Sequence, residues 1–298
     1  MSPYLKRNYH YYLMLVLPIA YFLIFKYGPI VGNVLAFRKY VPGGSMYGEE
    51  WVGLRYFKMF WNDPSFWSAF QNSLVLSILN LVISFTFPII FALLLNEILG
   101  KKIKTLIQTI SYFPNFVAVI VVVGILKELL SPTNGIANDF LGYFGVDPIF
   151  FMNEADWFRT IYITSDIWQF MGWNAIIYTA ALSSVDTQLY EAAEMDGAGR
   201  WRQTISVTIP QILPTISVVL IISLGSMLAL GFEKVLLLYT PSNSTTSDII
   251  DTFVFRMGLQ NNNYSYATAV GLFGGLIGLM LVSAGNYLSK KISGFSLY

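Results

Sequence analysis

Long segments without any charged side chain alternate with short polar segments along this chain. Five segments contain no Asp, Glu, Lys or Arg: residues 64–96, 105–126, 167–185, 203–232 and 257–289. Their apolar residues run continuously instead of alternating with polar ones, which favours helices over the strands of a membrane barrel. A helix needs about 20 residues to cross the hydrocarbon core of a bilayer, so all five segments are long enough to span a membrane.

An apolar segment near the N-terminus adds a sixth candidate, and the pattern predicts an all-α integral membrane protein with six transmembrane helices. The predicted spans are residues 11–31, 72–97, 105–127, 160–181, 212–235 and 266–288. Lys6 and Arg7 precede the first span as they would in a signal peptide, but Lys26-Tyr27-Gly28-Pro29 lacks the small residues of a cleavage site. We therefore expect an uncleaved first span and a single transmembrane domain over residues 1–298.

The composition fits a membrane protein and excludes several kinds of active site. Hydrophobic residues make up 55% of the chain and charged residues only 12%, against about 25% charged in an average soluble domain. Cysteine is absent and His10 is the only histidine, which excludes disulfides, cysteine-ligated zinc and multi-histidine metal sites. The chain has no phosphate-binding loop of the G-x-x-x-x-G-K-[ST] type, so if ATP drives this protein another chain hydrolyses it. We expect no metal or cofactor on this chain, and no nucleic-acid partner, because its basic residues form no patch interleaved with aromatics.

Lysine and arginine residues predict the orientation, because short cytoplasmic segments are enriched in them. The clearest marker is the basic turn at residues 100–104, which reads Gly-Lys-Lys-Ile-Lys. With the N-terminus inside, this turn, the segment 186–210 and the C-terminus all lie in the cytoplasm. The segments 32–71, 128–159 and 236–265 then face outside, where acidic residues offset the basic ones.

The cytoplasmic segment 186–210 has a distinctive polar pattern. Glu191-Ala192-Ala193 is followed by Asp196 and Gly197 and, after nine further residues, by Val207-Thr208-Ile209-Pro210. This pattern resembles the EAA loop of ATP-binding-cassette (ABC) import permeases, the cytoplasmic loop that docks on the ATPase subunit. Under this interpretation the ATPase-coupling residues are Glu191, Ala192, Ala193, Asp196 and Gly197. The two alanines permit close approach, and Gly197 lets the chain turn. The alternative is an amphipathic connector whose solvated face includes Glu191 and Asp196.

Other segments resemble carbohydrate import permeases of the maltose type. They are residues 66–73, Tyr112-Phe113-Pro114, Asn134-Gly135, 231–239, 251–256 and 267–273. The last three are similar to the complex-saccharide, LplB-like branch of that family, and the resemblance covers about residues 12 to 290. It implies the type I ABC importer permease fold with a cytoplasmic coupling helix, in the cell membrane of a bacterium.

The resemblance also implies partners. They are a second homologous permease subunit, two ATPase subunits that hold ATP and magnesium, an extracellular sugar-binding lipoprotein, an oligosaccharide substrate and the lipid bilayer. ATP binding would close the ATPase pair, the coupling loops would transmit that closure, and the path would open alternately to the two sides.

Sugars are bound by aromatic faces and hydrogen-bonding groups, and the fourth and fifth spans offer both. The substrate-path candidates are Asp166, Phe170, Trp173, Asn174, Ser226, Phe232 and Glu233. Asp166, Phe170 and Trp173 follow at intervals of four and three residues and so share a helix face. An ionisable residue inside a span is a functional candidate by default. The alternatives are a solvated helix start for Asp166, helix packing for Ser226 and the neighbouring Ser223, and an ion pair between Glu233 and Lys234.

These observations lead to four hypotheses about function, which the sequence supports to different degrees. The leading hypothesis is the permease subunit of an ATP-driven importer of oligosaccharides, and therefore a transport subunit and not an enzyme. An ABC permease for another polar solute, such as a peptide or amino acid, is the alternative in the same class. An ion-coupled secondary transporter would show a carboxylate relay or broken spans in both halves of an inverted repeat. An intramembrane enzyme would need a polar catalytic pair deep in the spans.

Overall fold

The structure is a computed structural model that describes residues 7–225, 227–228 and 230–293. It consists of two compact units. The first comprises Met1–Phe66 and Phe253–Phe273, and the second comprises Trp67–Thr252 and Gly274–Tyr298. The expectation of one transmembrane domain over the whole chain stays a prediction.

The first unit begins with a continuous helical run, Tyr9–Phe37, made of α2 (Tyr9–Tyr21), η1 (Phe22–Tyr27) and η2 (Gly28–Phe37). In the most apolar 18-residue part of this run no residue is buried. A short hairpin pairs β1 (Arg38–Lys39) antiparallel with β2 (Glu50–Trp51). After it come α3 (Arg55–Trp61) and, later in the chain, η6 (Arg256–Gln260). The rings of Phe60, Phe66 and Phe273 pack together as the apolar centre of this unit.

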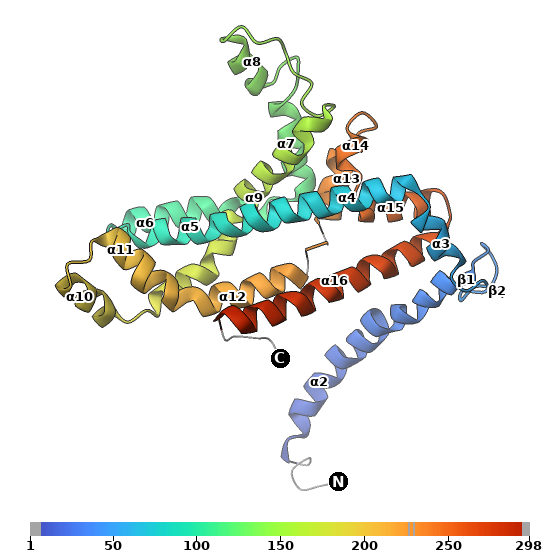
Figure 1. Cartoon of the computed structure of the whole chain (residues 1–298), viewed down its shortest axis with the longest axis horizontal. Helices are drawn as coiled ribbons and strands as arrows, with labels where there is room; N and C mark the ends of the chain where they lie inside the picture. Colours follow the sequence, from blue (N-terminus) through green and yellow to red (C-terminus); the bar gives the residue numbers. More distant parts are fainter. Residues whose placement is uncertain (1–6, 226, 229, 294–298) are drawn as a thin grey trace. The chain divides into compact units, whose positions relative to one another are not determined.

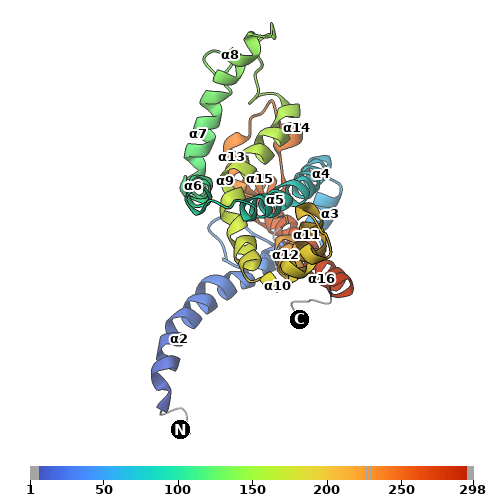
Figure 2. The same cartoon turned by 90° about the vertical axis from the view of Figure 1, so that its left-hand side faces the viewer.

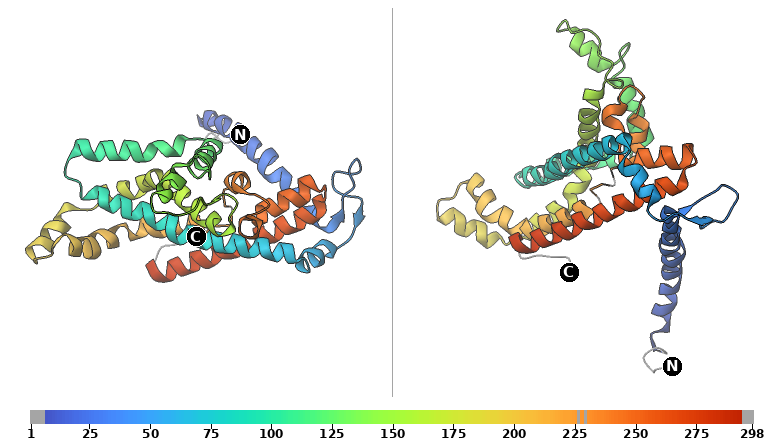
Figure 3. Two further views of the ribbon diagram at one scale, coloured as in Figure 1. Left: turned by 90° about the horizontal axis from the view of Figure 1, so that it is seen from above. Right: turned by 45° about the vertical axis from the view of Figure 1, so that its right-hand side comes forward.

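The second unit is a bundle of helices, several of which are interrupted. The segments that form it are α4 (Pro64–Leu79), η3 (Asn80–Ser84), α5 (Phe85–Asn96), α6 (Lys101–Tyr112), η4 (Phe113–Phe116), α7 (Val119–Leu129), α8 (Ile136–Gly142), α9 (Ala155–Ser183), α10 (Thr187–Met195), α11 (Arg200–Gln203), η5 (Thr204–Thr208), α12 (Ile209–Gly225), α13 (Phe232–Leu238), α14 (Ser244–Ser247), α15 (Ile250–Phe255) and α16 (Tyr264–Ser293). The first residues of α4, the C-terminal half of α15 and the N-terminal third of α16 belong to the first unit. Within the second unit, the C-terminal half of α16 lies beside α12 (Figures 1 and 3).

Helix α9 is the central element of the second unit and contacts α5, α6, α12, α13 and α14. In Figure 2 it lies between α6 and α5. A glycine permits the closest of these approaches, because a Cβ atom on Gly172 would collide with the backbone carbonyl of Ser111 on α6. Buried residues on α9 also anchor two apolar clusters. One surrounds Tyr162 and the other surrounds Tyr178.

Among the described residues, four helical runs are long and apolar enough to cross a membrane: Tyr9–Phe37, Pro64–Asn96, Arg200–Gly225 and Tyr264–Tyr287. A fifth candidate is the pair Lys101–Phe116 and Val119–Leu129, which meet at an angle of 101°. Helix α9 is 29 residues long, but Asp166, Gln169 and Asn174 lower its hydropathy. The structure therefore supports a helical membrane protein, while the number of six spans is not confirmed.

Two of the predicted spans differ from the structure. The span predicted at 105–127 is two helices joined by a bend, because Pro114 tightens the chain into a 3-10 turn and Val117 and Ala118 then adopt extended conformations. Gln169 stabilises this bend from α9 by donating its side-chain amide to the carbonyl of Val117 at 3.1 Å. The span predicted at 212–235 is also interrupted, since α12 ends at Gly225 and α13 begins at Phe232.

Candidate functional site: a cavity between helices and an exposed helical hairpin

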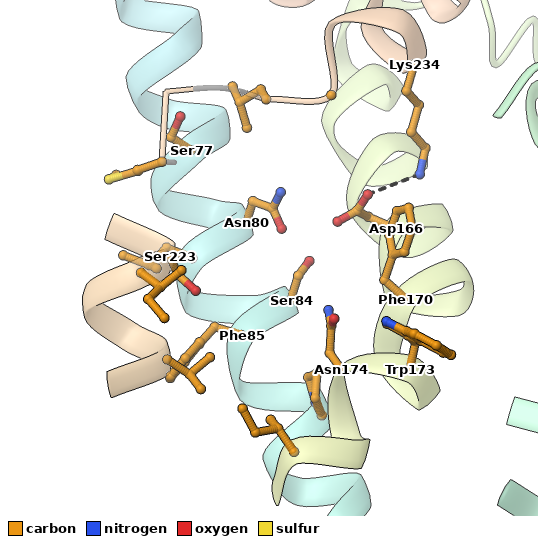
Figure 4. A pocket seen from close by; sticks show the side chains of 18 of the residues that line it. Ser77, Asn80, Ser84, Phe85, Asp166, Phe170, Trp173, Asn174, Ser223 and Lys234 are labelled. Atoms are coloured by element: carbon orange, nitrogen blue, oxygen red, sulfur yellow. Dashed lines mark hydrogen bonds and ion pairs between the residues drawn. The ribbon is translucent and has the colours of Figure 1, made fainter. Parts of the chain in front are cut away.

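The second unit contains a cavity of about 1030 Å³. Most of its described lining residues come from three groups of helices: the continuous run α4–η3–α5, the middle of α9, and the pieces α12 and α13 of the interrupted fifth segment (Figure 4). Val119 at the start of α7 also lines it. This volume is at the upper end of the range for small-molecule sites, about 300–1,000 Å³.

Helix α9 contributes the wall that the sequence predicted. Asp166, Phe170, Trp173 and Asn174 all line the cavity, because their spacing places them on one face of the helix. Trp173 is 44% exposed and meets Phe116 edge to face, with ring centroids 5.4 Å apart. The wall thus offers aromatic surface beside an amide and a carboxylate.

An ion pair joins this wall to α13. The Nζ atom of Lys234 lies 3.3 Å from Oδ1 of Asp166, and only 3% of the lysine side chain is exposed. The same ammonium lies over the rings of Tyr162 and Phe170, at 5.3 Å and 5.9 Å from their centroids. Such ring contacts add electrostatic stabilisation to a desolvated cation.

This pairing corrects two sequence-based interpretations. Lys234 does not pair with Glu233, because adjacent residues on a helix point in different directions. Glu233 is instead an exposed residue on the cavity wall. Asp166 is not a solvated residue at the start of a helix, since α9 begins at Ala155 and only 14% of the Asp166 side chain is exposed. Sequence reasoning missed Lys234 as a lining residue.

The α4–η3–α5 run supplies hydroxyl and amide groups. Ser77, Asn80 and Ser84 line the cavity at intervals of three and four residues, and Figure 4 shows Asn80 and Ser84 directed into it. The hydroxyl oxygens of Ser77 and Ser84 are buried and have no hydrogen-bond partner among the described residues. The substrate-path candidates from the sequence include none of these three residues, although polar positions at helical spacing in an apolar run are the signal that identifies them.

Asn72, on α4, has a different role. Its side-chain amide donates to the carbonyls of Thr245 and Asp248, and its carbonyl oxygen accepts from Arg159. It therefore holds the loop around α14 against α4, outside the cavity.

The fifth segment provides the remaining lining residues. Ser223, Phe232 and Glu233 border the cavity. Ser226, which the sequence also placed on the path, lies outside the described residues.

The segment predicted as the coupling loop forms a helical hairpin at one end of the second unit (Figure 1). Asp186 caps α10 by accepting a hydrogen bond of 2.9 Å from the backbone of Gln188. Gly197 has φ +77°, a left-handed conformation that favours glycine. Two backbone hydrogen bonds of 2.9 Å close the end of α10: Gly197 donates to Glu194, and Ala198 donates to Ala193.

This hairpin is largely exposed. Glu191, Ala192 and Asp196 are exposed and Ala193 is partly buried. Two large apolar side chains stand out at its tip, Met195 at 88% and Trp201 at 78% exposed. The hairpin is held to the start of the fifth segment by a 2.9 Å hydrogen bond between the hydroxyls of Tyr190 and Thr208. Among the described residues no cluster of three or more His, Asp or Glu side chains could hold a metal ion.

Comparisons with known proteins agree on one kind of protein. The family model for the binding-protein-dependent transport system inner membrane component matches residues 84–294. The polygalacturonan/rhamnogalacturonan transport system permease protein YteP of Bacillus subtilis (strain 168) is 44% identical over 287 residues, covering 96% of this chain and 89% of YteP. Protein LplB of the same organism is 42% identical over 294 residues, covering 99% and 92%. The crystal structure of a bacterial ABC transporter involved in the import of the acidic polysaccharide alginate superposes with a TM-score of 0.91 at 39% identity, covering 97% of this chain and 98% of that chain.

Proposed function

This chain belongs to the family of binding-protein-dependent transport system inner membrane components, and from this premise we propose that it is the permease subunit of an ATP-driven importer of oligosaccharides. Its relatives are transport permeases and not enzymes. The similarity to YteP, LplB and the alginate transporter confirms the family resemblance and the type I permease fold expected from the sequence. The substrates of YteP and of the alginate transporter favour a complex saccharide as the substrate here.

The chemistry of the cavity carries the substrate proposal. Trp173, Phe170 and Phe232 provide aromatic surface, and Asn80 and Asn174 provide neutral donors and acceptors. Sugars present apolar faces of CH groups and a rim of hydroxyls, so they are complementary to such a wall. A peptide or amino acid, the alternative within the same class, would bring two charged termini. An ion-coupled transporter has no support in the family to which the chain belongs.

The partners follow from the same premise. The chain pairs with a second homologous permease, and each permease docks on one ATPase subunit that binds ATP and magnesium. An extracellular sugar-binding lipoprotein delivers the saccharide. Residues 186–210 dock on the ATPase through Glu191, Ala192, Ala193, Asp196 and Gly197, which places both termini in the cytoplasm of a bacterial cell. The exposure of the hairpin supports this assignment, because Met195 is a large apolar side chain and is 88% exposed.

Reconstitution tests the proposal. The chain is purified with its partner chains, inserted into liposomes, and supplied with ATP inside and loaded binding protein outside. We expect uptake of labelled oligosaccharides that requires ATP, and no uptake of tripeptides or amino acids. Uptake of a peptide in place of every saccharide tested would refute the substrate class, and uptake that follows an ion gradient without ATP would refute the importer class.

A further inference from the structure

The charged side chains on the cavity wall differ in how far they are exposed to a bound ligand. Three charged side chains line the cavity on this chain: Asp166, Glu233 and Lys234. The ammonium of Lys234 is 3% exposed and is enclosed by the Asp166 carboxylate and the rings of Tyr162 and Phe170. The Asp166 side chain is 14% exposed, and Glu233 is an exposed residue.

The two carboxylates are therefore what a bound molecule meets first. Oδ1 of Asp166 is engaged with Lys234, and Figure 4 shows its other oxygen on the side of the cavity that Asn80 faces. The ammonium behind it fixes the position of this carboxylate. A carboxylate has two acceptor oxygens and, when ionised, no donor. This part of the wall consequently offers acceptors for hydroxyl groups, with the neutral groups of Asn80, Ser84 and Asn174 beside them.

We infer that this wall binds an uncharged sugar unit through its hydroxyl groups and disfavours a uronate unit. The inference rests on the proposed function and names the charge class of the saccharide at this subsite. A sugar hydroxyl donates to the second oxygen of Asp166, beside Asn80, in a charge-assisted hydrogen bond, which is stronger than a bond between neutral groups. The carboxylate of a uronate would instead lie near Glu233, whose charge no lysine or arginine among the described lining residues balances because Lys234 is paired with Asp166, and like charges placed together repel. The polygalacturonan named for YteP and the alginate named for the structural relative are both acidic, so the inference distinguishes this subsite from the substrates of both proteins.

A matched pair of ligands isolates the charge. α-(1→4)-Trigalacturonate and its fully methyl-esterified form share one carbon skeleton and differ in whether the carboxyl groups are ionised. Binding of each to the purified transporter, without binding protein, is measured by saturation-transfer NMR titration, which suits weak ligands. We expect the ester to bind about tenfold more tightly than the acid.

Variants of this chain show whether its own wall is the cause. Glu233→Gln removes an exposed charge without breaking the ion pair, so the acid should bind several-fold more tightly while the ester changes by less than about twofold. Asp166→Asn leaves the Lys234 charge unbalanced, so it should weaken the ester and favour the acid. Glu128→Gln is the matched control, because Glu128 is exposed at the end of α7 and is not one of the cavity-lining residues. It should change neither affinity.

The outcomes separate this inference from the proposed function. If the acid binds as tightly as the ester or more tightly, the inference is wrong while the oligosaccharide function stands. An unchanged ratio in Glu233→Gln would also overturn it, since the wall of this chain would then not set the preference. Binding of neither saccharide, together with no saccharide uptake in liposomes, would overturn both proposals.

Discussion

The turn after α10 allows a direct test of coupling, because the chain offers two glycines that differ in one respect. Gly197 has φ +77° and Gly199 has φ −69°. A Cβ atom added at either position would meet no other atom within 4 Å. Replacing each glycine by alanine therefore adds the same methyl group to the same exposed loop, and only Gly197→Ala forces a side chain into the left-handed region.

The expected magnitude follows from the backbone. A non-glycine residue in the left-handed helical conformation costs about 1–2 kcal/mol, which lowers the population of the native turn relative to alternatives by about 5- to 30-fold. The two hydrogen bonds that Gly197 and Ala198 make to the end of α10 depend on this turn. Because the loop is exposed, the cost falls on the shape of the docking hairpin and not on the packed helices. Asn tolerates this conformation better than alanine, so Gly197→Asn should be intermediate.

The assay compares ATP hydrolysis by the reconstituted complex with and without loaded binding protein. Gly197→Ala should lower the stimulated rate by about fivefold or more and leave the basal rate and the yield of assembled complex unchanged. Gly199→Ala should retain stimulation within about twofold of the unmodified protein. Gly197→Trp should abolish stimulation, because it adds a large side chain to a residue whose backbone conformation is already unfavourable. Equal stimulation in the Gly197→Ala and Gly199→Ala proteins would refute the view that the geometry of this turn transmits the ATPase movement.

Three further predictions concern orientation, substrate and packing. A reporter that is active only in the cytoplasm should work when fused after Gly100 and fail after Ser244, and the opposite result would reverse the topology and remove the docking argument. Trp173→Ala should weaken saccharide binding by about 1 kcal/mol, or about fivefold, by deleting an aromatic face, and unchanged binding in NMR titrations would move the sugar contact to the partner permease. Gly172→Ala should lower the unfolding free energy by about 1–3 kcal/mol, because α9 must move away from α6, whereas Gly124→Ala, which adds a methyl group in open space, should be neutral or slightly stabilising. Thermal melts in detergent compare these two variants, and equal melting temperatures would contradict the close approach.

The sequence predicted the apolar helices well because hydrophobic length alone identifies them. Residues 11–31, 72–97 and 266–288 all lie within helical runs of the structure or end one residue beyond them. The bend after Pro114 could not be predicted in the same way, because the flanking residues remain apolar on both sides. It depends on a tertiary contact, the Gln169 amide on the carbonyl of Val117, and residues 52 positions apart carry no joint signal in one sequence.

The site shows the same division between local and distant information. The α9 face was predictable, since Asp166, Phe170 and Trp173 follow the helical period. Lys234 was not, because its partner is 68 residues away and the nearest acidic residue in sequence, Glu233, was the natural choice. Adjacent residues on a helix point in different directions, which argues against a pair between Glu233 and Lys234. This rule could not, however, identify Asp166 as the partner of Lys234.

If residues 186–210 dock on the ATPase as proposed, the connectivity around this hairpin indicates how one loop would act on both sides of the cavity. Helix α9 ends at Ser183 and α10 begins at Thr187, so little free chain separates the hairpin from the wall that carries Asp166. At about 1.5 Å per residue, the 29 residues of α9 form a rod of about 43 Å. On its other side the hairpin continues through η5 into α12. The hydrogen bond between the hydroxyls of Tyr190 and Thr208 holds α10 to η5. A displacement of the hairpin is thus delivered to α9 and to α12 together. The ion pair from Asp166 to Lys234 then links α9 to α13, beyond the break in the fifth segment.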